Sequence, residues 1–226
     1  MRLQAFFACL LLMLTHAGGL SAQQPQRVLV MGDSFMTSNG SRGQAVPQLL
    51  GKALGTKVTS RAVTGARYVY GLPITGALGF NIPKQWRGGR WDWVVMNGGG
   101  NDLWMGCGCG QCNRRLNRLI SPDGRQGLIP QTVARARGSG ARVIYVGYLR
   151  SPGRGSPIEG CKVWGDRMEA RVAKMAQRDK GTTFVPLAGM VPNGDRSFHA
   201  ADMIHPSPKG GAAAVRVIVR AMARAR

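Results

Sequence analysis

The chain has 226 residues and a formal net charge of +21 at pH 7, with 31 basic and 10 acidic residues. Such a surface attracts polyanions, anionic lipid headgroups or acidic polysaccharide in a salt-dependent way. The basic residues are scattered and belong to no recognisable nucleic-acid reader module, which argues against a specific nucleic-acid partner.

The first 22 residues have the pattern of a secretory signal peptide. Arg2 supplies the positive start, residues 5–14 form an apolar stretch, and Leu20-Ser21-Ala22 is a small-residue exit. The apolar run is shorter than the roughly 20 residues of a membrane-spanning helix. An uncleaved membrane anchor is the alternative. We therefore predict a cleaved signal peptide (1–22) and one mature domain (23–226) that is secreted or periplasmic.

Apolar, β-rich runs alternate with longer amphipathic stretches along the mature chain. The expected strands are residues 28–31, 58–63, 93–97, 143–147 and 182–186. The expected helices are residues 44–54, 126–137, 163–178 and 208–224, the last with Ser207 as N-cap. Glycine- and proline-bearing stretches at 71–90, 106–112 and 151–160 are interpreted as loops. This alternation predicts a parallel sheet in a three-layer α/β/α sandwich, with ligands at the carboxyl edge of the strands.

The first expected strand ends at Gly32-Asp33-Ser34. Gly32 permits a tight turn, which places Ser34 at the start of the next segment, where backbone N–H groups point outward. A serine hydroxyl there is a candidate nucleophile if a base and an orienting acid reach it. By itself the tripeptide is also an ordinary turn.

Two more glycine-bearing segments follow expected strands. Gly65, within residues 62–66, would let the backbone approach a ligand and donate its N–H, although a simple loop glycine is the alternative. Asn101 follows three glycines, and its amide could donate to a developing negative charge. A glycine-rich stretch can also hold phosphate, but the dinucleotide pattern and the Walker lysine are missing.

Four cysteines lie beyond the predicted signal peptide: Cys107, Cys109, Cys112 and Cys161. In an oxidising compartment an even number predicts two disulfides, for which three connectivities exist. A Cys107–Cys109 bridge would close a very tight ring, so we favour pairings that join the cluster to Cys161. A zinc site is the alternative, because the intervening glycines would let the backbone wrap a metal. Secretion argues against zinc, and we expect no metal.

The last expected loop carries Asp202 and His205. His205 would take the proton from Ser34 and return it to the leaving group, while Asp202 would hold the imidazole tautomer. His199 is the rival base, since it precedes Asp202 at the inverse spacing. We favour His205 because Pro206 and the helix that follows would fix its loop. A surface loop in which Asp202 caps nearby backbone is the structural alternative.

Together these segments resemble the sequence blocks of the SGNH hydrolases, also called GDSL-type esterases and lipases, across essentially the whole mature chain. The resemblance implies a flavodoxin-like sandwich with five central strands and a catalytic triad of Ser34, Asp202 and His205. It also implies an oxyanion hole made by the N–H groups of Ser34 and Gly65 and by the Asn101 side chain. The segment before Gly65 lacks the asparagine that members often carry. The cysteine cluster is not a feature of the family. A pocket wall over the acyl group is one interpretation of it, and we favour the other, a staple that holds an insertion.

The predicted function is hydrolysis of carboxylic esters by a serine hydrolase, through an acyl-enzyme intermediate and without a cofactor. The substrate stays open among lipid, aryl and O-acetyl glycan esters, and an anionic envelope surface is a further candidate partner. Two alternatives remain. One is an acyltransferase on the same fold, and the other is a non-catalytic binder of cell-envelope polyanions, against which the intact Ser34, Asp202 and His205 argue.

Overall fold

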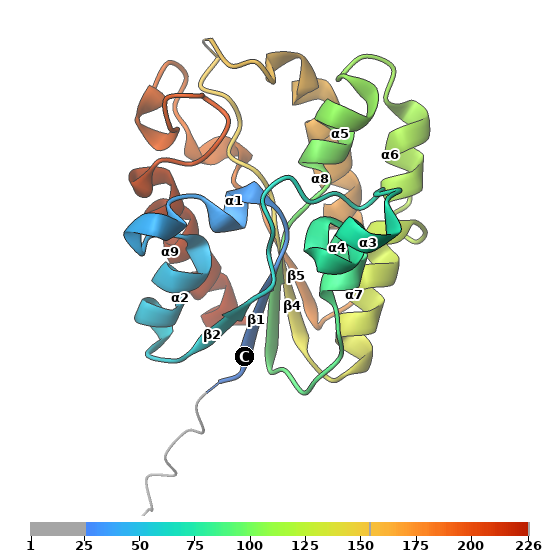
Figure 1. The fold of residues 1–226 in the computed structure, drawn as a ribbon, viewed down its shortest axis with the longest axis vertical. Coiled ribbons are helices and arrows are strands. Elements are labelled where there is room, and N and C mark those ends of the chain that lie inside the picture. The colour runs from blue at the N-terminus through green and yellow to red at the C-terminus, as the bar shows by residue number, and fades with distance from the viewer. Residues whose placement is uncertain (1–25, 154, 226) are drawn as a thin grey trace, which may run out of the picture.

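The computed structural model describes residues 26–153 and 155–225, so the predicted signal peptide lies outside the described residues. The described chain forms a five-stranded sheet in which every pair of neighbouring strands is parallel (Figure 1). The strand order is β2-β1-β3-β4-β5, the order of flavodoxin-like doubly wound sheets. The strands are β1 (Val28–Met31), β2 (Val58–Ser60), β3 (Trp93–Met96), β4 (Arg142–Val146) and β5 (Thr182–Val185).

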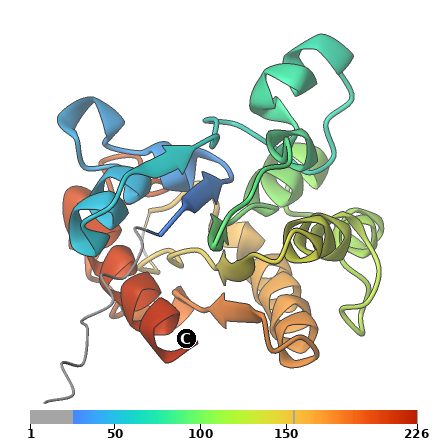
Figure 2. The ribbon, with the colours of Figure 1, turned by 90° about the horizontal axis from the view of Figure 1, so that it is seen from below.

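Helices cover both faces of this sheet, which confirms the predicted α/β/α sandwich (Figure 2). The longer helices are α2 (Val46–Leu54), α5 (Gly100–Cys107), α6 (Asn113–Leu119), α7 (Leu128–Gly138), α8 (Lys162–Gln177) and α9 (Pro208–Arg224). The shorter ones are α1 (Ser34–Thr37), α3 (Pro73–Thr75) and α4 (Ile82–Gln85). Side chains of α1, α2 and α9 pack on one face, and those of α4 to α8 pack on the other.

The residues of β1 show why the predicted strands are continuous runs of apolar residues. Val28 and Val30 point to the face covered by α2 and α9, whereas Leu29 and Met31 point to the opposite face. All four side chains are fully buried. Because successive side chains of a strand alternate between faces, a central parallel strand has to be apolar at every position.

The four expected helices appear as α2, α7, α8 and α9, and α9 begins at the predicted cap. The Ser207 hydroxyl accepts a hydrogen bond from the Gly210 N–H at 3.2 Å. The loop prediction for residues 71–90 was partly wrong, because α3, a π-helical turn (Gly76–Phe80) and α4 lie within it. Pro73 and Pro83 stand in the first turns of α3 and α4, where a missing N–H breaks no helical hydrogen bond.

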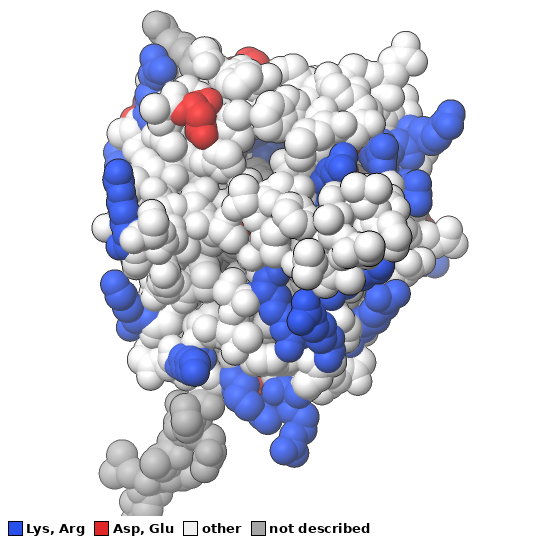
Figure 3. Space-filling model, viewed as in Figure 1, with Lys and Arg blue, Asp and Glu red and all other residues white. Residues whose placement is uncertain are grey.

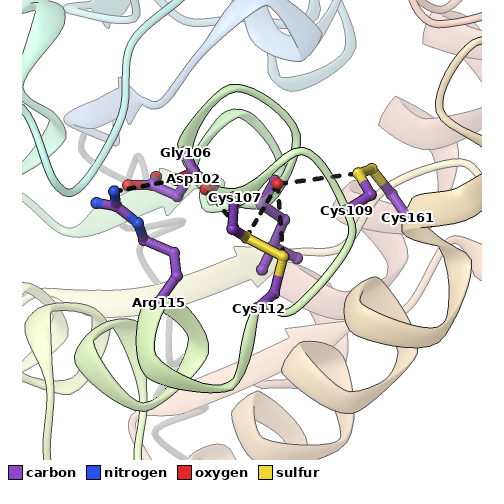
Figure 4. Close-up of a disulfide and its surroundings, with 8 residues drawn as sticks. Asp102, Gly106, Cys107, Cys109, Cys112, Arg115 and Cys161 are labelled. Atoms are coloured by element: carbon purple, nitrogen blue, oxygen red, sulfur yellow. Dashed lines mark hydrogen bonds between the residues drawn. A yellow bond between two sulfur atoms is a disulfide. The ribbon is translucent and has the colours of Figure 1, made fainter.

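Two disulfides join the cysteines, as Figure 4 shows: Cys107 with Cys112 and Cys109 with Cys161. The cluster is therefore joined to Cys161, as expected, and the thiols are paired with one another rather than gathered as four metal ligands. The Cys109–Cys161 bridge ties the loop after α5 to the start of α8 across 52 residues of sequence. Closing a loop of that length constrains the unfolded chain by roughly 4 kcal/mol. Within the described ranges, no helix is long and apolar enough to span a bilayer.

Candidate active site

Ser34 lies just beyond the carboxyl end of β1, directly after a sharp turn at Gly32 and Asp33. Gly32 has φ of 140°, and a Cβ there would collide with the Asn97 carboxamide, so no larger residue fits this turn. Asp33 caps α1, because its Oδ1 accepts from the Phe35 N–H at 3.0 Å. Ser34 is thus the first helical residue, and its side chain remains only slightly exposed.

A buried network around Asp33 fixes the position of this turn. Asp33 and Asn97 exchange two hydrogen bonds, from the Asp33 N–H to Asn97 Oδ1 (3.2 Å) and from Asn97 Nδ2 to Asp33 Oδ1 (3.0 Å). The Tyr148 hydroxyl donates to Asp33 Oδ2 at 2.5 Å and accepts from the Gly100 N–H at 3.2 Å. Burial raises the pKa of Asp33, although the hydrogen bonds from Tyr148, Phe35 and Asn97 act in the opposite direction. The carboxyl ends of β1, β3 and β4 are therefore linked directly behind Ser34.

Gln85 fixes the same turn from the other side. Its Oε1 accepts from the Gly32 N–H at 2.7 Å, and its Nε2 donates to the carbonyl oxygens of Gly32 and Gly79, both at 2.8 Å. The side chain is fully buried, so these bonds satisfy backbone groups that water does not reach. Together with Asn97, Gln85 leaves the Gly32 peptide no alternative orientation.

The two further oxyanion candidates lie on adjoining segments. Gly65 has φ of 78° in a turn that the Thr64 hydroxyl links to the Thr37 hydroxyl of α1 at 2.7 Å. Asn101 Nδ2 donates to the Ala66 carbonyl at 3.1 Å. Because an amide nitrogen carries two N–H groups, Asn101 keeps one donor for a ligand.

Asp102 joins α5 to the segment that follows Gly65. Its two carboxylate oxygens accept from the N–H groups of Tyr68 (2.8 Å) and Val69 (2.7 Å). Burial raises the pKa of Asp102 to about 6, although both backbone hydrogen bonds favour its ionised form. The residue after Asn101 therefore holds the Gly65 segment beside the start of α5.

Asp202 and His205 form a hydrogen-bonded pair in the loop before α9. His205 Nδ1 lies 2.6 Å from Asp202 Oδ2, while Asp202 Oδ1 accepts from the backbone N–H groups of Ile204 and His205, both at 3.0 Å. Partial burial would raise the pKa of Asp202, but hydrogen bonds from the His205 ring and from these two N–H groups hold it below its usual value. An ionised Asp202 keeps the proton of His205 on Nδ1 and leaves Nε2 as the basic nitrogen.

The rival base, His199, is differently placed. Its side chain is buried, and its Nδ1 has no hydrogen-bond partner among the described residues. Burial lowers the pKa of His199, which favours the neutral ring. Asp202 is engaged by His205, so the structure gives His199 no orienting acid.

Ser34, Asn101 and His205 converge on one cavity of about 520 Å³. They come from the end of β1, from α5 and from the loop before α9. Gly65 is not part of the cavity wall. Among the described residues no hydrogen bond joins Ser34 Oγ to the His205 ring. Such bonds are often long in free enzymes and shorten when substrate binds.

Much of the cavity wall is apolar, and the basic side chains described in it, Arg150 and Lys162, each have a carboxylate partner. Leu103, Trp104 and Met168 belong to it. Arg150 also lines the cavity, but its guanidinium binds Asp166 (2.8 Å) and Glu169 (2.7 Å). Among the described residues of this wall, no basic side chain therefore lacks a carboxylate partner.

Comparison with known proteins decides the family. The model of the GDSL-like lipase/acylhydrolase family matches residues 30–213. The chain belongs to this family. The matched residues begin inside β1 and end inside α9, so they include the turn at Ser34, Asn101 and the Asp202–His205 loop.

Solved structures of similar proteins share the fold. A protein of Slackia heliotrinireducens assigned to the SGNH hydrolases has a TM-score of 0.61 at 22% identity, over 88% of this chain and 99% of that chain. The psychrotrophic esterase EstA of a Pseudoalteromonas species, inhibited by monoethylphosphonate, has a TM-score of 0.57 at 13% identity, over 88% of this chain and 97% of that chain. A carbohydrate esterase family 2 enzyme of Corynascus thermopiles (Myceliophthora fergusii), with a carbohydrate-binding domain, has a TM-score of 0.59 at 16% identity, over 88% of this chain and 66% of that chain. Identities this low establish the fold alone. A search of curated proteins gave no match.

The sequence interpretation missed three residues that support the nucleophile: Gln85, Asn97 and Tyr148. Asn97 directly follows β3 in the segment that drew attention to Asn101, so its place at the carboxyl edge was a usable signal. Gln85 and Tyr148 bond to residues 53 and 115 positions away, respectively, and no local pattern marks either one.

Proposed function

We propose that the protein is a serine esterase that hydrolyses carboxylic esters through an acyl-enzyme intermediate. The observation that carries this proposal is the meeting of Ser34, Asn101 and the Asp202–His205 pair at one cavity. A hydroxyl, an oriented imidazole and an amide donor are the groups that acyl transfer requires. Membership of the GDSL-like lipase/acylhydrolase family supports the same chemistry.

In the proposed first step, Ser34 Oγ attacks the ester carbonyl and transfers its proton to His205 Nε2. The tetrahedral intermediate collapses, the C–O bond to the alcohol breaks, and His205 returns the proton to the departing oxygen. In the second step a water molecule gives its proton to His205 and attacks the acyl group on Ser34. The carboxylic acid then leaves, and the serine recovers its proton. Asp202 stays ionised throughout and stabilises the imidazolium.

The negative charge on the carbonyl oxygen would be held by the N–H at the start of α1 and by the free N–H of Asn101. Gly65 is the third proposed donor. Its segment is bonded to α1 through Thr64 and to α5 through Ala66. These bonds would keep the three donors in a fixed arrangement before substrate arrives.

Replacement of Asn101 by alanine is expected to lower kcat by roughly 10²–10³, the usual effect of removing one oxyanion donor. The change should leave KM within a few-fold, because the interaction forms mainly in the transition state. Steady-state kinetics on a p-nitrophenyl ester measures both constants. Asn193→Ala is the matched control, since Asn193 lines the same cavity. An Asn101→Ala enzyme as fast as the control would remove Asn101 from the mechanism.

The cavity wall favours an uncharged acyl group. Leu103, Trp104 and Met168 offer apolar surface, and Arg150 is neutralised by its two carboxylate partners. An acyl chain would gain from burial there, whereas the basic side chains described in the wall, Arg150 and Lys162, already have carboxylate partners. We therefore place the acyl part of the ester in this cavity.

The deciding experiment is hydrolysis of p-nitrophenyl acetate, butyrate and octanoate by the oxidised protein. We expect turnover of all three, with kcat/KM highest for an ester longer than acetate. No release of p-nitrophenol from any ester would overturn the proposed activity and favour acyl transfer or envelope binding.

We also propose that the protein is exported and loses residues 1–22. The two disulfides support export, because such bridges persist in oxidising compartments. The intact mass of protein recovered from the producing cells should correspond to a chain beginning at Gln23. A mass that includes Met1 to Ala22 would contradict cleavage.

A further inference from the structure

Three large apolar side chains are exposed on one short segment of the face covered by α4. Leu72, Ile74 and Leu78 are 63%, 78% and 66% exposed, respectively. Leu72 is the N-cap of α3, Ile74 lies in α3 and Leu78 lies in the π-helical turn, so the three fall within seven residues of sequence. The segment Leu72–Phe80, here called the apolar projection, extends beyond the neighbouring helices in Figure 2. Exposed apolar side chains that gather in this way mark an interaction surface.

The apolar projection is held in a defined conformation. The Tyr70 hydroxyl hydrogen-bonds to Thr75 Oγ1 at 2.9 Å, and the Tyr70 and Phe80 rings stack with centroids 5.9 Å apart. Gln85 holds the Gly79 carbonyl from inside the protein. Thr75 and Phe80 of the segment are thus held against Tyr70 and are half-buried, whereas its large aliphatic side chains are exposed.

Basic side chains surround the apolar projection. The exposed Arg87 donates to the Ala77 carbonyl at 3.3 Å. Lys84 is also exposed and lies in α4. The Arg67 guanidinium lies over the Tyr70 ring, 5.3 Å from its centroid. Figure 3 shows an uncharged protrusion over α3 between two groups of basic side chains, one over α6 and one below α3 and α4.

No acidic residue counters these cations in the surrounding sequence. From Ser34 to Trp91 the chain contains eight basic residues and no Asp or Glu. Helix α6 adds the exposed Arg114 and Arg118 and is likewise free of acidic residues. An apolar tip beside exposed cations is complementary to a lipid surface with anionic headgroups, because aliphatic groups enter the acyl boundary while cations meet the headgroups.

We propose that the apolar projection docks the protein on anionic lipid surfaces. Leu72, Ile74 and Leu78 enter the interface, and Lys84, Arg87 and the α6 arginines bind the headgroups. The chain just before the apolar projection is bonded to Asp102, the neighbour of Asn101, through the N–H groups of Tyr68 and Val69, so docking holds the site close to the lipid. This inference does not depend on ester hydrolysis and can be tested on a catalytically inactive variant.

The test is co-sedimentation of the purified protein with vesicles of phosphatidylcholine alone or of phosphatidylcholine mixed with phosphatidylglycerol. We expect binding to the mixed vesicles only, weakened by salt. The combined variant Leu72→Ser, Ile74→Ser and Leu78→Ser should lose at least about tenfold in apparent affinity. The variant Lys84→Gln with Arg87→Gln should lose about fivefold for each cation removed.

Two matched controls separate docking from general attraction by a basic protein. Met105→Ser with Val163→Ser removes the exposed apolar side chains of α5 and α8. Arg216→Gln with Arg220→Gln removes two exposed cations of α9, on the opposite face of the sheet. Both should bind within about twofold of wild type, since α9 lies away from the proposed contact and α5 and α8 lie outside the projection.

Equal binding by wild type and the triple serine variant would overturn the proposal, because attraction would then rest on charge alone. Equal losses in the control variants would overturn it as well. So would size-exclusion data showing a wild-type dimer and a monomeric triple variant, because a second copy would then cover the apolar projection. Circular dichroism melting checks each fold. Should the triple variant melt early, Ile74→Ser alone replaces it.

Discussion

Replacement of Ser34 by alanine is expected to lower kcat for p-nitrophenyl butyrate by a factor of about 10⁴ or more, since nucleophile and base fail together when either is removed. The fold should survive. The hydroxyl of Ser34 is not part of the Asp33 network, whose bonds involve the side chains of Asp33, Asn97 and Tyr148 and backbone N–H groups. Kinetics and thermal unfolding of the same preparation measure both effects.

Ser151→Ala is the matched control for this change, because Ser151 lies in the same cavity wall. It should retain turnover within about threefold of wild type, as expected for a residue outside the chemistry. A Ser34→Ala enzyme that still hydrolyses the ester at the wild-type rate would end the serine-esterase proposal. A folded but inactive Ser34→Ala variant that still binds mixed vesicles would separate docking from catalysis.

Exchange of His205 for asparagine is expected to lower kcat by roughly 10³–10⁴ as well. The imidazole alone combines a basic nitrogen facing the cavity with an N–H held by Asp202 at 2.6 Å. Asparagine can accept a hydrogen bond but cannot carry the proton away from Ser34. The rate of acylation, measured as the rate of p-nitrophenol release under single-turnover conditions, should fall as far as kcat.

The same exchange at His199 distinguishes the two candidate bases. His199→Asn should keep kcat per folded molecule within about threefold, because that ring is buried and has no carboxylate partner. Its effect should appear as a lower melting temperature. The opposite pattern, with His199→Asn inactive and His205→Asn active, would exchange the assigned roles.

Much of this arrangement was predictable because its determinants are local. The β1 residues are apolar on both faces, and Gly32, Asp33 and Ser34 follow one another at the turn, so a short stretch specifies both strand and site. Asp202 and His205 are likewise close enough in sequence for one loop to form their pair. The cap at Ser207 then fixes where that loop ends.

The residues that escaped prediction act over long separations. Gln85 satisfies the backbone at Gly32, and Tyr148 reaches Asp33 from the far side of β3. Neither side chain belongs to a periodic pattern or a short motif, because its role is defined only once three strands lie side by side. Helices α3 and α4 were hidden for a different reason, since proline in a first helical turn looks the same in sequence as proline in a loop.

The two disulfides are interleaved along the chain: Cys109 lies inside the ring closed by Cys107 and Cys112, and bonds outside it to Cys161. Pairing of nearest neighbours during oxidation therefore gives the wrong isomer, and recovery requires thiol–disulfide exchange. Cys161 and the adjoining Lys162 belong to the cavity wall. Protein made in a reducing cytosol, or oxidised without an isomerase, would present a wall that is untethered or mispaired. The preference for acyl-chain length, compared between laboratories, would then differ with the expression host rather than with the protein sequence.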